Sequence, residues 1–148
     1  MSGSDLSVAA AFQTQIVAFV RAFGLHRPEQ TPCGQPIPVS EAHALLELSR
    51  DESLAQHELG TRLQLEKSSV SRLVSQLQAR GWLRRGQREG DGRVVWLELT
   101  SAGRDAAARL SAARAEKITR LVDAIPEDKR ATVLDGLNIL VEALRDYH

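Results

Sequence analysis

Hydrophobic residues recur with helical spacing near both ends of the 148-residue chain. The first apolar stripe consists of Phe12, Ile16, Phe19 and Phe23. The second consists of Leu134, Leu137, Val141 and Leu144, with Leu140 widening it. Such intervals predict amphipathic helices, the first of which should end at Gly24. Because both stripes need a partner surface along their length, we expect the end helices to pack together and against a second copy; packing within one chain is the alternative.

The middle of the chain predicts short helices separated by loops. Residues 25–38 contain four prolines and should form a loop, because proline lacks an amide donor. Serine commonly caps helix N-termini, and three starts are expected, at Ser40, at Ser53 before residues 54–63, and at Ser68 or Ser69. The residues expected to face inward are Ala44, Leu45, Leu48, Leu54, Leu59, Leu63, Val70, Leu73, Val74 and Leu77.

After Gly81, which should end the third short helix, the hydrophobic period changes to two. Residues 82–85 and 94–99 are predicted to form a hairpin whose turn lies over the glycine-containing residues 89–92. Thr100 and Ser101 can cap a long helix that Pro126 stops. One apolar side of that helix is expected from Leu110, Ile118, Leu121 and Ile125. The order helix, turn, helix and hairpin is that of a winged helix-turn-helix.

The expected fold class is therefore mainly α with a small β-hairpin wing. We expect one domain over residues 1–148, with the winged helix-turn-helix at 40–100 and dimerisation helices in 1–39 and 101–148. The chain is 43% hydrophobic, which is enough for a core. It has no run of eighteen apolar residues, and residues 1–5 lack the order of a signal peptide. A cytoplasmic protein without a membrane partner is expected.

Charge is divided along the chain although the net charge is zero. Residues 62–93 hold eight basic and three acidic residues, a net charge of +5. Residues 29–61 hold six acidic residues and one basic residue, a net charge of −5. One end of the domain can therefore attract phosphates while the rest stays soluble, which favours nucleic acid as the partner.

Polar residues on the second helix of the predicted helix-turn-helix point to double-stranded DNA. Small hydroxyls let the backbone approach the major groove, and Arg72 or Gln76 can then reach base edges. The residues expected to contact DNA are Arg62, Lys67, Ser68, Ser69, Ser71, Arg72, Ser75, Gln76, Arg84, Arg85, Arg88, Asp91 and Arg93. A solvated polar face is the alternative reading of the helix.

The run from Leu59 to Arg85, together with residues 91–93 and 97–103, resembles the helix-turn-helix and wing of the MarR family of transcriptional regulators. The resemblance implies a homodimeric DNA-binding protein, usually a repressor, with a small-molecule effector pocket. It makes Arg93 a minor-groove probe and Asp91 the carboxylate that orients it. Many relatives carry a second arginine where this chain has Gly92, so a weaker phosphate grip is expected.

Other functions find less support in the sequence. No G-x-S-x-G motif, phosphate-binding glycine loop or carboxylate pair beside a histidine is present, so no enzyme activity and no cofactor are expected. A winged helix used for protein contacts is a rival, but it does not need the +5 segment or Arg93. The single cysteine, Cys33, could act as a redox sensor, although it lies in the proline-rich loop. A metal site from Cys33, Glu41, His43 and His57 lacks ligand-like spacing, so no metal is expected.

Overall fold

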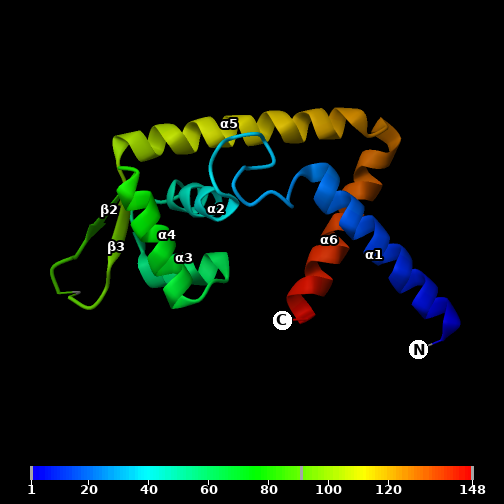
Figure 1. Ribbon diagram of the computed structural model, residues 1–148, viewed down its shortest axis with the longest axis horizontal. Helices are drawn as coiled ribbons and strands as arrows, with labels where there is room; N and C mark the ends of the chain where they lie inside the picture. The colour runs from blue at the N-terminus through cyan, green and yellow to red at the C-terminus, as the bar shows by residue number, and fades with distance from the viewer. Residues whose placement is uncertain (1, 91, 148) are drawn as a thin grey trace. The chain divides into compact units, whose positions relative to one another are not determined.

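The structure is a computed structural model that describes residues 2–90 and 92–147, and it is mainly helical with one small antiparallel sheet (Figure 1). The predicted fold class is confirmed. Its elements in chain order are α1 (Gly3–Phe23), α2 (Val39–Leu48), β1 (Leu54–Ala55), α3 (Gln56–Leu63), α4 (Lys67–Ala79), β2 (Leu83–Gly86), β3 (Trp96–Leu99), α5 (Ser101–Ala124), the 3-10 turn η1 (Glu127–Lys129) and α6 (Arg130–Tyr147).

The chain divides into two compact units, of which the first ends at Ala113 and the second begins at Arg114. The first unit holds the helices and strands up to the middle of α5, and it contains the predicted winged helix-turn-helix. In the second unit, the Arg130 guanidinium donates to the carbonyl oxygens of Val122 and Ile125 at 3.0 and 3.1 Å. Arg130 thereby caps the end of α5, where Pro126 breaks the helix as predicted.

The three strands form a sheet in the order β1-β3-β2, and both pairings are antiparallel. The hairpin register places Leu83 opposite Leu99 and Gly86 opposite Trp96. The prediction that a helix starts after Ser53 is wrong, because Leu54 and Ala55 are a short edge strand paired with β3 and α3 begins only at Gln56. Two causes explain the difference. Leu54 and Ala55 are both buried on this strand, and their pairing satisfies backbone groups that would be unpaired at a free edge of β3.

Serine caps were also wrongly predicted at two other helices. Helix α2 begins at Val39 with Pro38 in the N-cap position, not at Ser40. Helix α4 begins at Lys67 with Glu66 as N-cap, so neither Ser68 nor Ser69 caps it. Neither cap residue makes a side-chain hydrogen bond, and at α2 proline fixes the backbone angle instead. Thr100 does cap α5 as predicted, because its Oγ1 accepts from the Gly103 amide at 3.1 Å.

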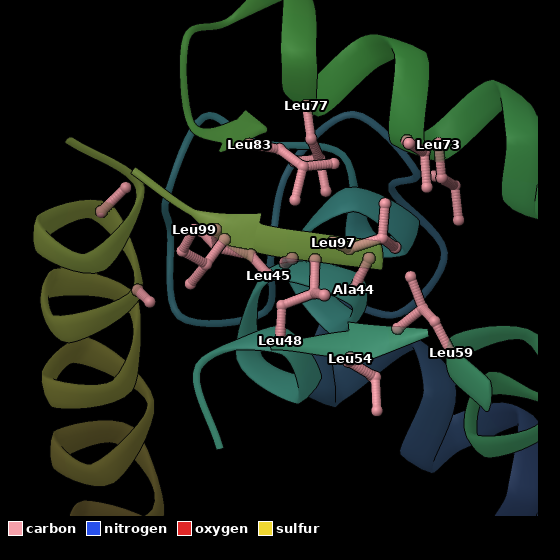
Figure 2. Packing of buried hydrophobic residues seen from close by; sticks show 14 of the residues in the cluster. Ala44, Leu45, Leu48, Leu54, Leu59, Leu73, Leu77, Leu83, Leu97 and Leu99 are labelled. Carbon is pink, nitrogen blue, oxygen red and sulfur yellow. The ribbon is translucent and has the colours of Figure 1, made fainter. Parts of the chain in front are cut away.

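The core is a cluster of leucine, valine and alanine side chains between α2, α3, α4, the sheet and the start of α5 (Figure 2). The predicted inward residues of α2 and α4 are all buried. They are Ala44, Leu45 and Leu48 on α2, and Val70, Leu73, Val74 and Leu77 on α4. Leu59 is buried too, whereas Leu63 is only half-buried. Truncating one of these leucines to alanine costs about 2–5 kcal/mol, so the core fixes how α4 sits on the sheet.

Long apolar surfaces remain uncovered outside this core. Neither α1 nor α6 has a buried residue among the described ones. The predicted apolar side of α5 is buried only at Leu110, while Ile118 and Leu121 are exposed. Helix α1 ends at Gly24 as predicted, in the left-handed conformation at φ 94°. With a mean hydropathy of 1.4, α1 is long and apolar enough to cross a membrane by length and composition alone.

Candidate nucleic-acid interface

Helix α4 has one buried and one exposed face. Its valines and leucines turn into the core, as Figure 2 shows for Leu73 and Leu77. With about 100° of rotation per residue, Ser68, Arg72 and Ser75 lie directly opposite that apolar stripe. The exposed polar residues are Lys67, Ser68, Ser71, Arg72, Ser75, Gln76 and Gln78, whereas Ser69 is half-buried. The outward face therefore offers serine hydroxyls, two glutamine amides, the Lys67 ammonium and the Arg72 guanidinium to a partner.

The turn before α4 is tight and fixes its direction relative to α3. Gln64 adopts the left-handed conformation at φ 54°, and the Leu65 amide donates to the Gly60 carbonyl at 3.0 Å. A Cβ at Gly60 would lie 3.1 Å from Cγ2 of Val70, so glycine allows the two helices to approach closely. Two short helices joined in this way form a helix-turn-helix.

The hairpin beyond the sheet forms the predicted wing. Strand pairing ends at Gly86 and Trp96, so residues 87–95 extend past the ladder. Within this segment, the Gln87 side-chain amide donates to the Gly92 carbonyl at 3.4 Å, and Gly90 takes a positive φ of 85°. Asp91 lies outside the described residues, so its predicted pairing with Arg93 stays a prediction.

Three predicted DNA-contacting cations are exposed and have no side-chain partner in the described part of the chain. The side chains of Lys67, Arg72 and Arg93 make no ion pair or hydrogen bond with any residue in the ranges 2–90 and 92–147. Lys67 and Arg93 line one groove of about 620 Å³ between the helix-turn-helix and the returning arm of the wing. The structure thus places Lys67, at the start of α4, and Arg93, on the wing, along the same groove.

Arg62, also expected to contact DNA, lies instead among carboxylates. Its guanidinium is 2.6 Å from Asp51, 3.5 Å from Glu58 and 3.8 Å from Glu47. The hydrogen bond with Asp51 is the main reason why the pKa of Arg62 is raised above its ordinary value. These contacts tie α3 to the end of α2, and the surrounding negative charge disfavours a phosphate at this position.

The arginines of the strands and the outgoing arm are also engaged. Arg84 pairs with Glu98 across the hairpin at 3.0 Å. Arg85 donates to the Ser75 hydroxyl at 2.8 Å and so joins the wing to α4. Arg88 donates to the Ser53 hydroxyl, and its guanidinium carbon lies 3.5 Å from the centroid of the Trp96 ring. Because arginine has five N–H donors, Arg84 and Arg85 retain donors for a phosphate.

An ion pair between Arg80 at the end of α4 and the buried carboxylate of Glu41 was missed in the sequence. Arg80 donates to both carboxylate oxygens of Glu41 at 3.1 and 3.2 Å, and it lies 5.1 Å from the centroid of the Trp82 ring. The Glu41 side chain is only 5% exposed. Its position three residues before the buried Ala44 was the available signal, because that spacing places it on the inward stripe of α2. This pair connects α2 with the end of α4.

The residues of the predicted redox and metal alternatives are dispersed. Cys33 is half-buried against the core, with its Sγ 3.1 Å from the Thr31 hydroxyl. Glu41 is occupied by Arg80. Within the described part of the chain, no group of three or more histidine, cysteine, aspartate and glutamate side chains could hold a metal ion.

Comparisons with known proteins agree with this geometry. A family model described as MarR family matches residues 35–94. Over 144 residues the chain is 21% identical to an uncharacterised HTH-type transcriptional regulator of Mycobacterium leprae, and the match covers 97% of each protein.

The crystal structure of Streptococcus pneumoniae FabT in complex with DNA has a TM-score of 0.75 at 21% identity, covering 97% of this chain and 99% of FabT. PcaV from Streptomyces coelicolor, in complex with its natural ligand, has a TM-score of 0.70 at 22% identity with the same coverage. The predicted winged-helix fold is confirmed, and the proteins matched are regulators, not enzymes.

Proposed function

We propose that this chain, a MarR-family protein across its winged-helix module, is a cytoplasmic homodimer that binds specific sequences of double-stranded DNA and represses transcription until a small molecule releases it. The observation that carries the proposal is the exposed polar face of α4, with Arg72 at its centre and Arg93 on the adjacent wing, neither of which has an ion-pair or hydrogen-bond partner within residues 2–90 and 92–147. FabT, which shares the fold, was crystallised with DNA.

Arg72 is proposed to read bases, and Lys67 and Arg93 to supply backbone and minor-groove contacts. Arg72 lies opposite the buried stripe of α4, where a side chain on a helix in the major groove meets base edges. Ser68, Ser71 and Ser75 allow the helix backbone to approach, and Gln76 extends the readable face. Asp91, Arg84 and Arg85 remain in the proposed interface, whereas Arg62 and Arg88 receive structural roles.

The test is selection of bound sites from random duplex DNA, followed by titration at several salt concentrations. Arg72→Ala should reduce the preference for the selected site by about 10–100-fold, because one bidentate base contact supplies discrimination of that size. Lys67→Ala should weaken selected and random duplexes alike and reduce the salt slope by about one. Arg145→Ala removes the same charge from α6 and should change neither quantity. Failure to enrich any sequence, with binding to a protein partner instead, would favour the protein-contact alternative.

The homodimer is proposed from the uncovered stripes on α1 and α6. The exposed fraction lies between 46 and 61% for each of five residues in these stripes. They are Phe12, Ile16 and Phe19 on α1, and Leu134 and Leu137 on α6. Such a surface on a soluble protein marks an interface. Leu137→Glu should give a monomer in sedimentation at micromolar concentration, while Asn138→Asp adds a charge at a polar position and should leave the dimer intact. A monomeric wild type, or recovery in the membrane fraction through α1, would contradict the proposal.

The proposed effector is a small organic molecule. PcaV shares the fold and was crystallised with its natural ligand, which supports regulation of this kind here. The test is to titrate phenolic compounds into the complex with the selected DNA site and to measure release. As a comparison, peroxide is added to the same complex. If peroxide releases wild type from DNA but does not release Cys33→Ser, the redox alternative is favoured over the small-molecule effector.

A further inference from the structure

The outer part of the wing is not held in place by the β-ladder. The last paired residues are Gly86 and Trp96, and Arg93 lies three residues before Trp96 on the returning arm. On that arm, the Val95 carbonyl accepts from the Gln56 amide at 2.8 Å, which anchors its base. The outgoing arm therefore needs another contact if the wing is to keep one direction.

Arg88 supplies that contact from the outgoing arm. Its guanidinium stacks 3.5 Å from the Trp96 ring centroid, and its Nη2 donates to the Ser53 hydroxyl. Ser53 immediately precedes β1, which pairs with β3. One side chain thus joins the outgoing arm, the start of the returning strand and the body of the winged-helix module.

We propose that Arg88 is a positioning residue that holds the wing so that Arg93 meets DNA, and not a phosphate ligand; this inference rests on the proposed function. The guanidinium has one face against Trp96 and one nitrogen on Ser53, so it is turned back toward the module. Lys67, Arg72 and Arg93, by comparison, have no such partners among the described residues. Charge alone does not define this role, because stacking combined with a directed hydrogen bond needs the planar guanidinium.

The first test separates positioning from phosphate contact. Dissociation constants on the selected site are measured over a range of salt concentrations for wild type, Arg88→Ala and Arg88→Lys. We expect Arg88→Ala and Arg88→Lys to bind about tenfold more weakly than wild type and to share one salt slope, because both lose the stacking and the directed hydrogen bond that place Arg93 on DNA, although lysine keeps the charge. If Arg88→Lys restores affinity while Arg88→Ala lowers the slope by about one, Arg88 is a phosphate ligand and the proposal is overturned.

Ser53→Ala provides a neutral test of the same contact. It should weaken DNA binding about threefold in the wild-type background and have no further effect in Arg88→Ala, because the two residues act through one hydrogen bond. Independent, additive effects of the two substitutions would overturn the proposed coupling.

Hydrogen exchange on the free protein tests the contact without DNA. Amides of residues 87–95 should exchange faster in Arg88→Ala and Arg88→Lys, while those of α2, which lies in the core, should be unchanged. Unchanged exchange in the wing would overturn the proposed contact even if DNA binds. If wild type binds no duplex at all, the proposed function fails, and faster exchange of the wing amides would still support the contact itself.

Discussion

Gly103 lies in the first turn of α5 against the backbone of Trp82, and Gly103→Ala is expected to destabilise the winged-helix unit. A Cβ at position 103 would overlap the Trp82 carbonyl oxygen and lie 2.9 Å from its carbonyl carbon. The same oxygen accepts from the Thr100 amide at 2.9 Å, and the Thr100 hydroxyl donates to the Gly81 carbonyl at 2.6 Å. An added methyl group would therefore clash with the backbone at Trp82, which the two Thr100 hydrogen bonds hold in place.

The size of the effect follows from three contributions. Forcing a methyl group into packed surroundings costs about 1–3 kcal/mol. Disturbing the two Thr100 hydrogen bonds costs about 1 kcal/mol each. Alanine recovers about 1 kcal/mol through its higher helix propensity. The expected loss in free energy of unfolding is therefore about 2–4 kcal/mol, and the melting temperature should fall by roughly 4–16 °C.

Urea unfolding followed by tryptophan fluorescence is the measurement, because Trp82 and Trp96 both lie in the first unit. Gly136→Ala on α6 is the matched control, since no atom lies within 4 Å of a Cβ there. The control should be neutral or more stable by up to about 1 kcal/mol. If Gly103→Ala is as stable as this control, α5 can move away from Trp82 without cost and the reasoning is refuted.

Three further substitutions or conditions test other contacts. Glu41→Gln should lower the free energy of unfolding by about 2 kcal/mol, measured in urea, because it removes the charge of the buried carboxylate that pairs with Arg80; an unchanged midpoint would contradict this. Cys33→Ser should leave DNA affinity unchanged in a gel-shift titration, since the thiol lies in the loop before α2; a severalfold loss would point to a role in binding. Hydrogen bonds from Ser2 lower the pKa of Asp5, so this contribution to α1 is complete above the ordinary value of 3.8 and is lost as pH falls through the lowered pKa. Protection of the first-turn amides, taken relative to their intrinsic exchange rates at each pH, should fall only in that acidic range and should stay constant in Asp5→Asn.

Periodicity was sufficient to predict the helices, the buried faces of α2 and α4, and the hairpin. The alternation along α4 separates Val70 and Leu73 from Ser71 and Arg72, and burial follows this division. Helix starts were harder to predict, because several residue types compete for them. Ser53 has the residue type of a cap, but Leu54 after it pairs with Leu97, which is far away in sequence, and so forms a strand in place of a helix start.

The charge pattern predicted where DNA should bind but not which cations are free. Arg80 and Glu41 are 39 residues apart, and Arg88 and Ser53 are 35 apart. Contacts over such separations depend on the folded packing of α2, α4 and the sheet, which local spacing does not encode. Within the basic segment 62–93, Arg62 contacts Asp51 and Arg88 contacts Ser53, and neither partner could be identified from local spacing.

The separation of the two faces of α4 also has an evolutionary consequence. Val70 and Leu77 hold the helix in the core and are buried, whereas Ser68, Ser71 and Arg72 face outward and take no part in that packing. Substitutions on the outer face leave the packing untouched, so a lineage carrying this module can change the surface that α4 presents without losing its fold. Ser75 is the exception, because its hydroxyl accepts from Arg85. Drift at that position would have to be accompanied by a change in the wing.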